Sequence, residues 1–252
     1  MHQQLSLHGS VQDGEIKITL HTLAALAGMH PSSVFDHCLV WTPRNPFTPV
    51  LAAGQVNQIE QYRITSTSSL LKGNETLPIE LYGDGTAEAL ATRDWEVGLS
   101  EIPEAGKRKV TSRSMFSSKV VEGNILDFLN NLGYTFSYEY FIRGYRFVMG
   151  DVVVTLFRTY IPGEKEDEDM KEVDATGAAT QDESKDNSDK IQLLDPSGQW
   201  TVRAEINVKQ LVDVDAIANA TSQLERIQFD LLGLFELSMP DRASLDTRVK
   251  AR

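Results

Sequence analysis

Only one cysteine, Cys38, is present among the 252 residues of the chain. A single thiol cannot form a disulfide within the chain, which excludes the cross-linked scaffolds of many small secreted domains and fits a reducing compartment. Long apolar runs are also absent, since no uninterrupted segment approaches the roughly 18 residues that cross a bilayer as a helix. The N-terminus, "MHQQLSLHGSV", has no basic region followed by an apolar run. We therefore expect a soluble protein that is neither secreted nor membrane-inserted.

Metal-ligating and nucleophilic residues are sparse as well. The five histidines, at positions 2, 8, 21, 30 and 37, show no paired metal-ligand spacing, and one cysteine cannot complete a zinc site. His37 and Cys38 are neighbours on a predicted strand, where adjacent side chains point to opposite faces, so we expect no hydrogen-bonded dyad. A glycine-rich phosphate loop between a strand and a helix is also missing. The sequence thus predicts no catalytic residue, no metal and no cofactor.

Basic residues are outnumbered, with 24 Lys and Arg against 36 Asp and Glu and a formal net charge of -12. This charge argues against a general binder of nucleic acid, because such proteins neutralise phosphates with lysine and arginine. Much of the excess lies in residues 164–190, which have 11 acidic and 4 basic side chains. This segment has almost no large apolar residues to offset the entropy of ordering, so we expect a disordered acidic loop. The alternative is an acidic segment that attracts a basic partner by its charge.

Alternating apolar and polar residues predict many short β-strands. The clearest alternation is "QWTVRAEINV", which follows a type I turn signal, "DPSG", at 195–198. Further strands are predicted at "QQLSLHGSV", "SVFDHCLVWT", "QYRITSTS", "LPIELYG", "RDWEVGLSEI" and "RKVTSRSMFSSKVV".

The aromatic stretch at residues 132–158, "LGYTFSYEYFIRGYRFVMGDVVVTLFR", predicts three strands. Arg143-Gly144 and Gly150-Asp151 separate them, and glycine can supply the positive φ of tight hairpins there. Its aromatic side chains could stack on nucleic-acid bases. The net charge and the lack of a basic stripe favour core packing instead.

Apolar residues at three- and four-residue spacing predict three helices. The first ends at Gly28, the second has Asn124 as N-cap and ends at Gly133, and the third, of about 17 residues, ends at Gly233. The apolar sets are Ile16, Leu20, Leu23, Leu26 and Ala27; Ile125, Phe128, Leu129 and Leu132; and Ile217, Ala220, Leu224, Ile227 and Leu231.

These elements predict a mainly β fold with about three α-helices. A large antiparallel sheet of this length curls into a barrel or splits into a sandwich. We expect a single β-barrel domain over residues 1–252, interrupted by the acidic loop at about 164–190. The helices should pack against the barrel or across its mouth.

A polar tunnel through such a barrel is the enzyme hypothesis to consider. Carboxylates at alternate positions of one strand could hold a divalent metal against phosphates. The comparable inward candidates are Glu139, Arg143, Arg203 and Glu205, and no strand has two carboxylates at that spacing. We expect Arg203 and Glu205 to form a salt-bridged or solvated pair.

Several segments resemble the Mediator subunit 18 family. They are "QQLSLHGSV" near the start, "LGYTFSYEYFIRGYRF" and "GDVVVTLFR" in the middle, and "DPSGQWTV", "ATSQL" and "PDRASLDTRV" near the end. The segments follow the family's order and cover nearly the whole chain apart from the proline-rich and acidic loops. The resemblance implies an antiparallel β-barrel related to the triphosphate tunnel fold, without the catalytic site of that fold.

The same resemblance implies a nuclear, non-enzymatic subunit of the Mediator head module, a coactivator of RNA polymerase II transcription. Such a subunit pairs with the similar barrel of subunit 20 and captures a C-terminal helix of subunit 8. Other head subunits and the polymerase are its wider partners, without direct contact to nucleic acid or membrane. The resemblance assigns no individual partner-binding residue. The alternative hypothesis is a metal-dependent phosphohydrolase of the triphosphate tunnel type.

Overall fold

The computed structural model describes residues 1–47, 54, 60–73, 75–82, 87–163, 190–209 and 213–249. The strands are β1 (His2–Val11), β2 (Ser32–Pro43), β3 (Ile64–Ser69), β4 (Leu71–Lys72), β5 (Glu75–Thr76), β6 (Glu96–Ser100), β7 (Thr111–Lys119), β8 (Tyr134–Met149), β9 (Val152–Pro162), β10 (Ile191–Leu193) and β11 (Trp200–Val208). The α-helices are α1 (Ile16–Ala27), α2 (Ala87–Ala91), α3 (Ile125–Asn131) and α4 (Val214–Asp230).

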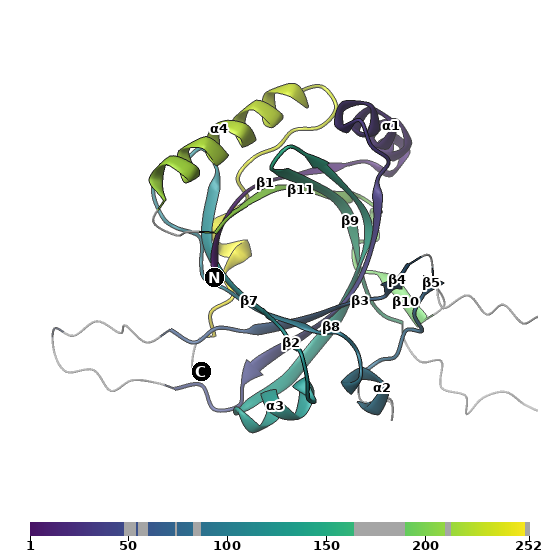
Figure 1. Cartoon of the computed structure of the whole chain (residues 1–252), viewed down its shortest axis with the longest axis vertical. Coiled ribbons are helices and arrows are strands. Elements are labelled where there is room, and N and C mark those ends of the chain that lie inside the picture. The colour runs from purple at the N-terminus through teal and green to yellow at the C-terminus, as the bar shows by residue number, and fades with distance from the viewer. Residues whose placement is uncertain are drawn as a thin grey trace, which may run out of the picture.

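Eight strands of the main sheet close into a barrel (Figure 1). Hydrogen bonds join them in the order β9-β11-β1-β7-β6-β3-β2-β8, and β8 pairs again with β9. The pairings around this ring are antiparallel. β10 adds to the end of β9, and β4 pairs with β5 in a separate hairpin. The predicted mainly β fold is confirmed, and so is the barrel rather than the sandwich.

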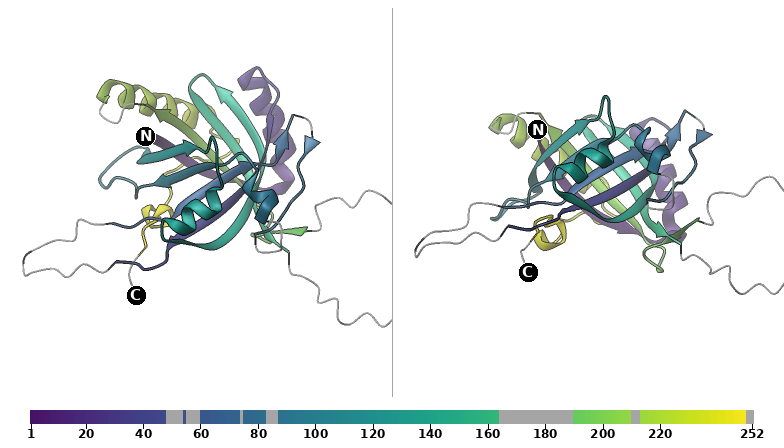
Figure 2. Two further views of the ribbon diagram at one scale, coloured as in Figure 1. Left: turned by 60° about the horizontal axis from the view of Figure 1, so that its bottom comes forward. Right: turned by 90° about the horizontal axis from the view of Figure 1, so that it is seen from below.

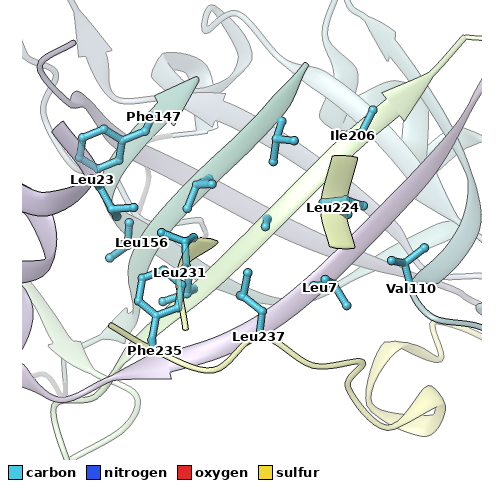
Figure 3. Packing of buried hydrophobic residues seen from close by; sticks show 14 of the residues in the cluster. Leu7, Leu23, Val110, Phe147, Leu156, Ile206, Leu224, Leu231, Phe235 and Leu237 are labelled. Carbon is cyan, nitrogen blue, oxygen red and sulfur yellow. The ribbon is translucent and has the colours of Figure 1, made fainter. Parts of the chain in front are cut away.

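The apolar faces of the strands point out of the barrel. Val202 and Ala204 of β11 are buried in one cluster with Leu224 of α4. Figure 3 shows Leu224 against the strands, and α4 lies outside their ring in Figure 1. Neighbouring residues of a strand point to opposite faces, so Arg203 and Glu205 of β11 face the lumen. The alternation therefore places polar side chains inside the barrel.

Helices cover two opposite sides of the barrel. α1 and α4 lie over one side, and α2 and α3 lie over the other (Figures 1 and 2). Under α1 and α4, apolar residues of β1, β8, β9 and β11 form one buried cluster. Under α3, Leu39 and Trp41 of β2 pack against Leu126 and Leu129. The helices thus pack on the outer wall, which is one of the two expected placements.

The predicted helices end or begin at their local signals. α1 ends at Gly28, whose φ of 64° is left-handed. α3 begins after Asn124, whose side chain accepts hydrogen bonds from the N–H groups of Leu126 and Asp127. α4 has 17 residues, and Gly233 with a φ of 89° follows it. None of the described helices has the length and apolar character that crossing a bilayer requires.

The aromatic stretch forms two long strands rather than three short ones. β8 is continuous over 16 residues and passes straight through the predicted turn at Arg143-Gly144. A Cβ atom on Gly144 would collide with the carbonyl oxygen of Leu156 on β9. A close approach between two strands, and not a turn, therefore requires this glycine. The hairpin predicted at Gly150-Asp151 is confirmed, with a φ of 63° at Gly150.

The predicted strand "LPIELYG" is wrong for its described residues, 77–82, which form no strand. Ile79 is buried with Phe35 and Phe141 on the outer wall of the barrel. The apolar side chains of this segment therefore serve packing without backbone pairing. The short helix α2, which follows, had no clear signal in the sequence.

The predicted acidic loop lies outside the described residues over 164–189. Its flanks are joined, because the N–H of Gly163 donates to the carbonyl of Lys190 at 2.9 Å and β10 pairs with β9. The turn at 195–198 is confirmed by a hydrogen bond of 3.1 Å from the N–H of Gly198 to the carbonyl of Asp195. The disorder of the loop and the single-domain organisation stay predictions.

Candidate functional site

The lumen of the barrel presents polar side chains from several strands. Ser6 of β1 lies opposite Glu205 of β11, and His8 lies opposite Arg203. Arg203 Nε lies 3.0 Å from Glu205 Oε2, which is the salt-bridged one of the two arrangements expected from the sequence. Glu205 also accepts a hydrogen bond of 2.8 Å from the side-chain amide of Gln4. This part of the lumen is a hydrogen-bonded polar wall.

The carboxylates of the lumen are dispersed. Glu205, Asp36 and Glu96 belong to three different strands, β11, β2 and β6. Burial raises the pKa of Asp36, and the nearby Arg146 opposes this shift. Within the described ranges, no group of three or more His, Cys, Asp or Glu side chains is placed to hold a metal ion. The arrangement lacks the several oxygen ligands that a divalent metal requires.

Two of the predicted inward residues lie on the outer wall instead. Glu139 is paired across the strands with Leu39, which packs under α3. Arg143 lies over the ring of Phe35, 5.5 Å from its centroid, on the same outer face. The prediction was wrong because alternation defines two faces of a strand but does not show which face the helices cover. Only Arg203 and Glu205 of the four candidates face the lumen.

Glu139 belongs to a buried polar network on the outer wall. Its carboxylate lies 2.7 Å from Nε2 of His37 and accepts a hydrogen bond from the N–H of Tyr82 at 3.3 Å. Arg93 lies 3.3 Å from Nδ1 of His37 and donates to the carbonyl of Pro78 at 2.6 Å. Burial lowers the pKa of His37, so a neutral ring donates from Nε2 while Nδ1 accepts from Arg93. The network fastens the segment before β6 to the barrel.

His37 and Cys38 point to opposite faces, as predicted. His37 is fully buried on the outer wall, whereas Cys38 faces the lumen, with Sγ 3.7 Å from the hydroxyl of Thr67. Burial raises the pKa of the Cys38 thiol to about 12. A thiol with this pKa stays protonated near neutral pH and is a poor nucleophile. His37 and Cys38 thus do not form a hydrogen-bonded dyad with each other.

The helices carry exposed apolar side chains, a feature that the sequence analysis missed. Phe128 of α3 is 58% exposed and Leu132, directly after α3, is 56% exposed, although both belong to the apolar set that predicts this helix. Val121, shortly before α3, is 97% exposed, and Val214 and Phe229 of α4 are exposed as well. Grouped exposed apolar side chains mark protein contact sites more often than scattered ones do. The outer surface thus carries exposed apolar side chains on and beside α3 and α4.

Comparison with known proteins matches the chain to one family. A family model described as Med18 protein matches residues 3–248. A relative from Yarrowia lipolytica, named Mediator of RNA polymerase II transcription subunit 18, is 36% identical over 252 residues, which cover 98% of this chain and 100% of that protein. The relative of the same name from Eremothecium gossypii is 29% identical. The match covers 99% of this chain and 98% of that protein.

A solved structure shares the fold. A chain in the structure of the Schizosaccharomyces pombe Mediator head module superposes with a TM-score of 0.69 at 16% identity, covering 94% of this chain and 98% of that chain. The family model spans nearly the whole sequence, and the Yarrowia relative matches along its full length. The chain therefore belongs to the Med18 family of Mediator subunits.

Proposed function

We propose that the chain is a non-enzymatic subunit of the Mediator head module, which acts in the nucleus in RNA polymerase II transcription. The observation that carries this proposal is the family match over residues 3–248. The shared fold with a chain of the fission yeast head module agrees with it. The polar lumen agrees as well, because its described carboxylates are too dispersed for a metal-dependent reaction.

Within the head module, we propose that the barrel pairs with the similar barrel of subunit 20 and captures a C-terminal helix of subunit 8. The sequence resemblance to Mediator subunit 18 supports both partners. The exposed apolar side chains of α3 and α4 supply the kind of surface that such contacts use. An amphipathic helix binds through its apolar face, and a partner barrel needs a broader surface.

Coexpression with subunits 20 and 8 of the same source organism tests this proposal. The tagged chain should retain both partners on affinity purification at moderate salt. A subunit 8 variant without its C-terminal helix is the matched control, and it should not copurify with the tagged chain. Recovery of the tagged chain alone in every combination would refute the proposed partners.

The competing hypothesis, a triphosphate tunnel phosphohydrolase, receives no support from the described lumen. A phosphate-release assay with nucleoside triphosphates and Mg²⁺ or Mn²⁺ should give no more phosphate than heat-denatured protein does. Metal-dependent release that grows with protein concentration would overturn the non-enzymatic assignment.

A further inference from the structure

A row of hydrogen-bond donors crosses the lumen wall at one level. Arg146 of β8 lies opposite Thr155 of β9, and Thr155 lies opposite Arg203 of β11. Arg203 in turn lies opposite His8 of β1. Side chains directly opposite each other share a face, so all of them point into the lumen. Their Cβ atoms are spaced about 4.5–5.5 Å from one strand to the next, which lets neighbours contact one small ligand.

The hydroxyl group within this row has no partner. Thr155 is 2% exposed, and its Oγ1 makes no hydrogen bond to any described residue. The residues on both sides of it, Arg146 and Arg203, can donate hydrogen bonds but cannot accept them. A buried hydroxyl without a partner is costly, so an acceptor between the two arginines would satisfy it.

The positive charge around the row is only partly balanced. Arg203 pairs with Glu205, whereas neither Arg146 nor Arg113 forms an ion pair with a described carboxylate. Arg113 donates from Nε to the side-chain oxygen of Gln4 at 2.8 Å, and the charge of Arg146 lowers the pKa of Asp36 against the larger effect of burial. Arg113, Arg146 and Arg203 thus lie along this part of the lumen, although the net charge of the whole chain is -12.

His8 belongs to the same row, and its Nε2 lies 3.4 Å from the hydroxyl of Ser6. Burial, together with the charges of Arg203 and Arg113, lowers the pKa of His8 to about 4. Its imidazole is therefore uncharged at neutral pH and carries one N–H group. Since Arg203 lies directly opposite His8, its guanidinium group and the imidazole share one region of the lumen.

Arg146, at one end of the row, also lines a cavity of about 730 Å³. Asp36, Glu96 and Lys119 line it together with Arg146. Arg146 is exposed, whereas its cross-strand neighbour Thr155 is buried. A small solute in this cavity can therefore contact Arg146.

We propose that the row of Arg146, Thr155, Arg203 and His8 binds a small phosphate-type oxyanion inside the barrel. Guanidinium groups match pairs of oxygen atoms on such an anion. The hydroxyl and the imidazole add single donors, and a tetrahedral anion has enough oxygen atoms to accept from all of them. The ligand is bound without being cleaved. This proposal does not depend on the assembly function, and either can fail without the other.

Calorimetric titration of the purified chain with inorganic phosphate and with pyrophosphate tests this site, in the presence of EDTA and at low ionic strength. Both anions should bind, and sulfate should compete because it has the same shape and similar acceptors. Acetate should not compete. No heat of binding and no rise in melting temperature with either phosphate would overturn the proposal, as would acetate binding that equals phosphate binding.

Two variants separate this site from general attraction of anions. Arg146→Gln should weaken phosphate binding at least about tenfold, because one charge-assisted contact is lost. Arg226→Gln is the matched control, since this arginine is 83% exposed on α4, and binding should be unchanged. Equal losses in the two variants would refute a specific lumen site.

Thr155→Val replaces the unpartnered hydroxyl with a methyl group of the same shape. It should weaken phosphate binding while leaving the melting temperature of the free protein unchanged or raised, because a costly buried hydroxyl is removed. Weaker phosphate binding without a fall in melting temperature distinguishes a binding role from a folding defect. A Thr155→Val variant that binds phosphate like the wild type would show that the row is not the site.

Discussion

Single residues in the lumen connect the stability of the barrel to pH. The folded protein keeps His8 neutral down to its lowered pKa of about 4, whereas an unfolded chain protonates this histidine near its ordinary value of 6.5. The unfolded state therefore binds more protons between these two values. Since acid then favours the unfolded state, His8 makes the fold less stable as the pH falls from about 6.5 to about 4.

His8→Gln should reduce this acid sensitivity. The loss in free energy of unfolding between about pH 7 and pH 4.5 should be smaller in the variant by on the order of 2 kcal/mol. Urea midpoints measured across this range give the comparison, with His30→Gln as the control because His30 is exposed. Equal pH dependence in His8→Gln and wild type would show that His8 titrates normally in the folded protein.

Two glycines of the barrel have similar sequence contexts but different surroundings. An added Cβ on Gly144 would collide with the backbone of β9, whereas the nearest atoms to an added Cβ on Gly98 lie 3.7 Å and 3.8 Å away. Gly144→Ala should therefore cost at least about 1–3 kcal/mol in free energy of unfolding, as expected for an overpacked site.

Gly98→Ala is the matched control, because both glycines lie in barrel strands and neither has a positive φ. Its free energy of unfolding, measured by urea titration, should be close to that of the wild type, since an added Cβ has room there. A Gly144→Ala variant as stable as Gly98→Ala would mean that β8 and β9 do not approach each other as closely as the structure has it.

At the scale of elements, the helices follow from local signals and the strand faces do not. Asn124 and Gly28 act through hydrogen bonds or backbone angles within a few residues, so their effect is visible in the sequence. The orientation of a strand face depends on where distant helices pack. This is why Glu139 and Arg143 were placed on the wrong side, although the alternation of β8 was recognised.

Gly144 illustrates a second limit of sequence patterns. A glycine between two β-rich runs is typical of a turn, and equally of two strands in close contact. The choice depends on Leu156, more than ten residues further along the chain. Long-range packing likewise explains the segment at 77–82, whose apolar residues are used on the outer wall rather than in a strand.

Helix α4 is held to the barrel chiefly by its apolar face. Leu224, from the apolar set that predicts this helix, is completely buried in the cluster with β1 and β11. Leu224→Ala should lower the free energy of unfolding of the isolated protein by about 2–5 kcal/mol, because the transfer and cavity terms add. Val214→Ala on the same helix is the control and should have little effect, since Val214 is 74% exposed.

Urea midpoints of the free protein, together with affinity for a subunit 8 helix peptide, test this prediction. A Leu224→Ala variant that is stable but fails to bind the peptide would assign Leu224 to a partner groove. A variant unchanged in both assays would contradict the packing of α4 in the structure.

At the scale of the whole molecule, the barrel closes without the acidic segment. Gly163 and Lys190 are hydrogen-bonded to each other, so a short linker can join the two flanks. Replacing residues 164–189 by a short glycine-serine linker should leave the melting temperature and partner binding intact, because this sequence has few apolar groups to bury. A large fall in melting temperature would show that the segment packs against the barrel.

A single cooperative transition in the same experiment would support the predicted single domain.

Assembly into the head module is the central claim, and the mass of the coexpressed complex tests it most directly. Light scattering on a size-exclusion column measures this mass for the chain purified together with subunits 20 and 8. The account predicts one peak whose mass equals the sum of one copy of each protein. Elution of the chain at its own mass, with subunits 20 and 8 in separate fractions, would contradict it.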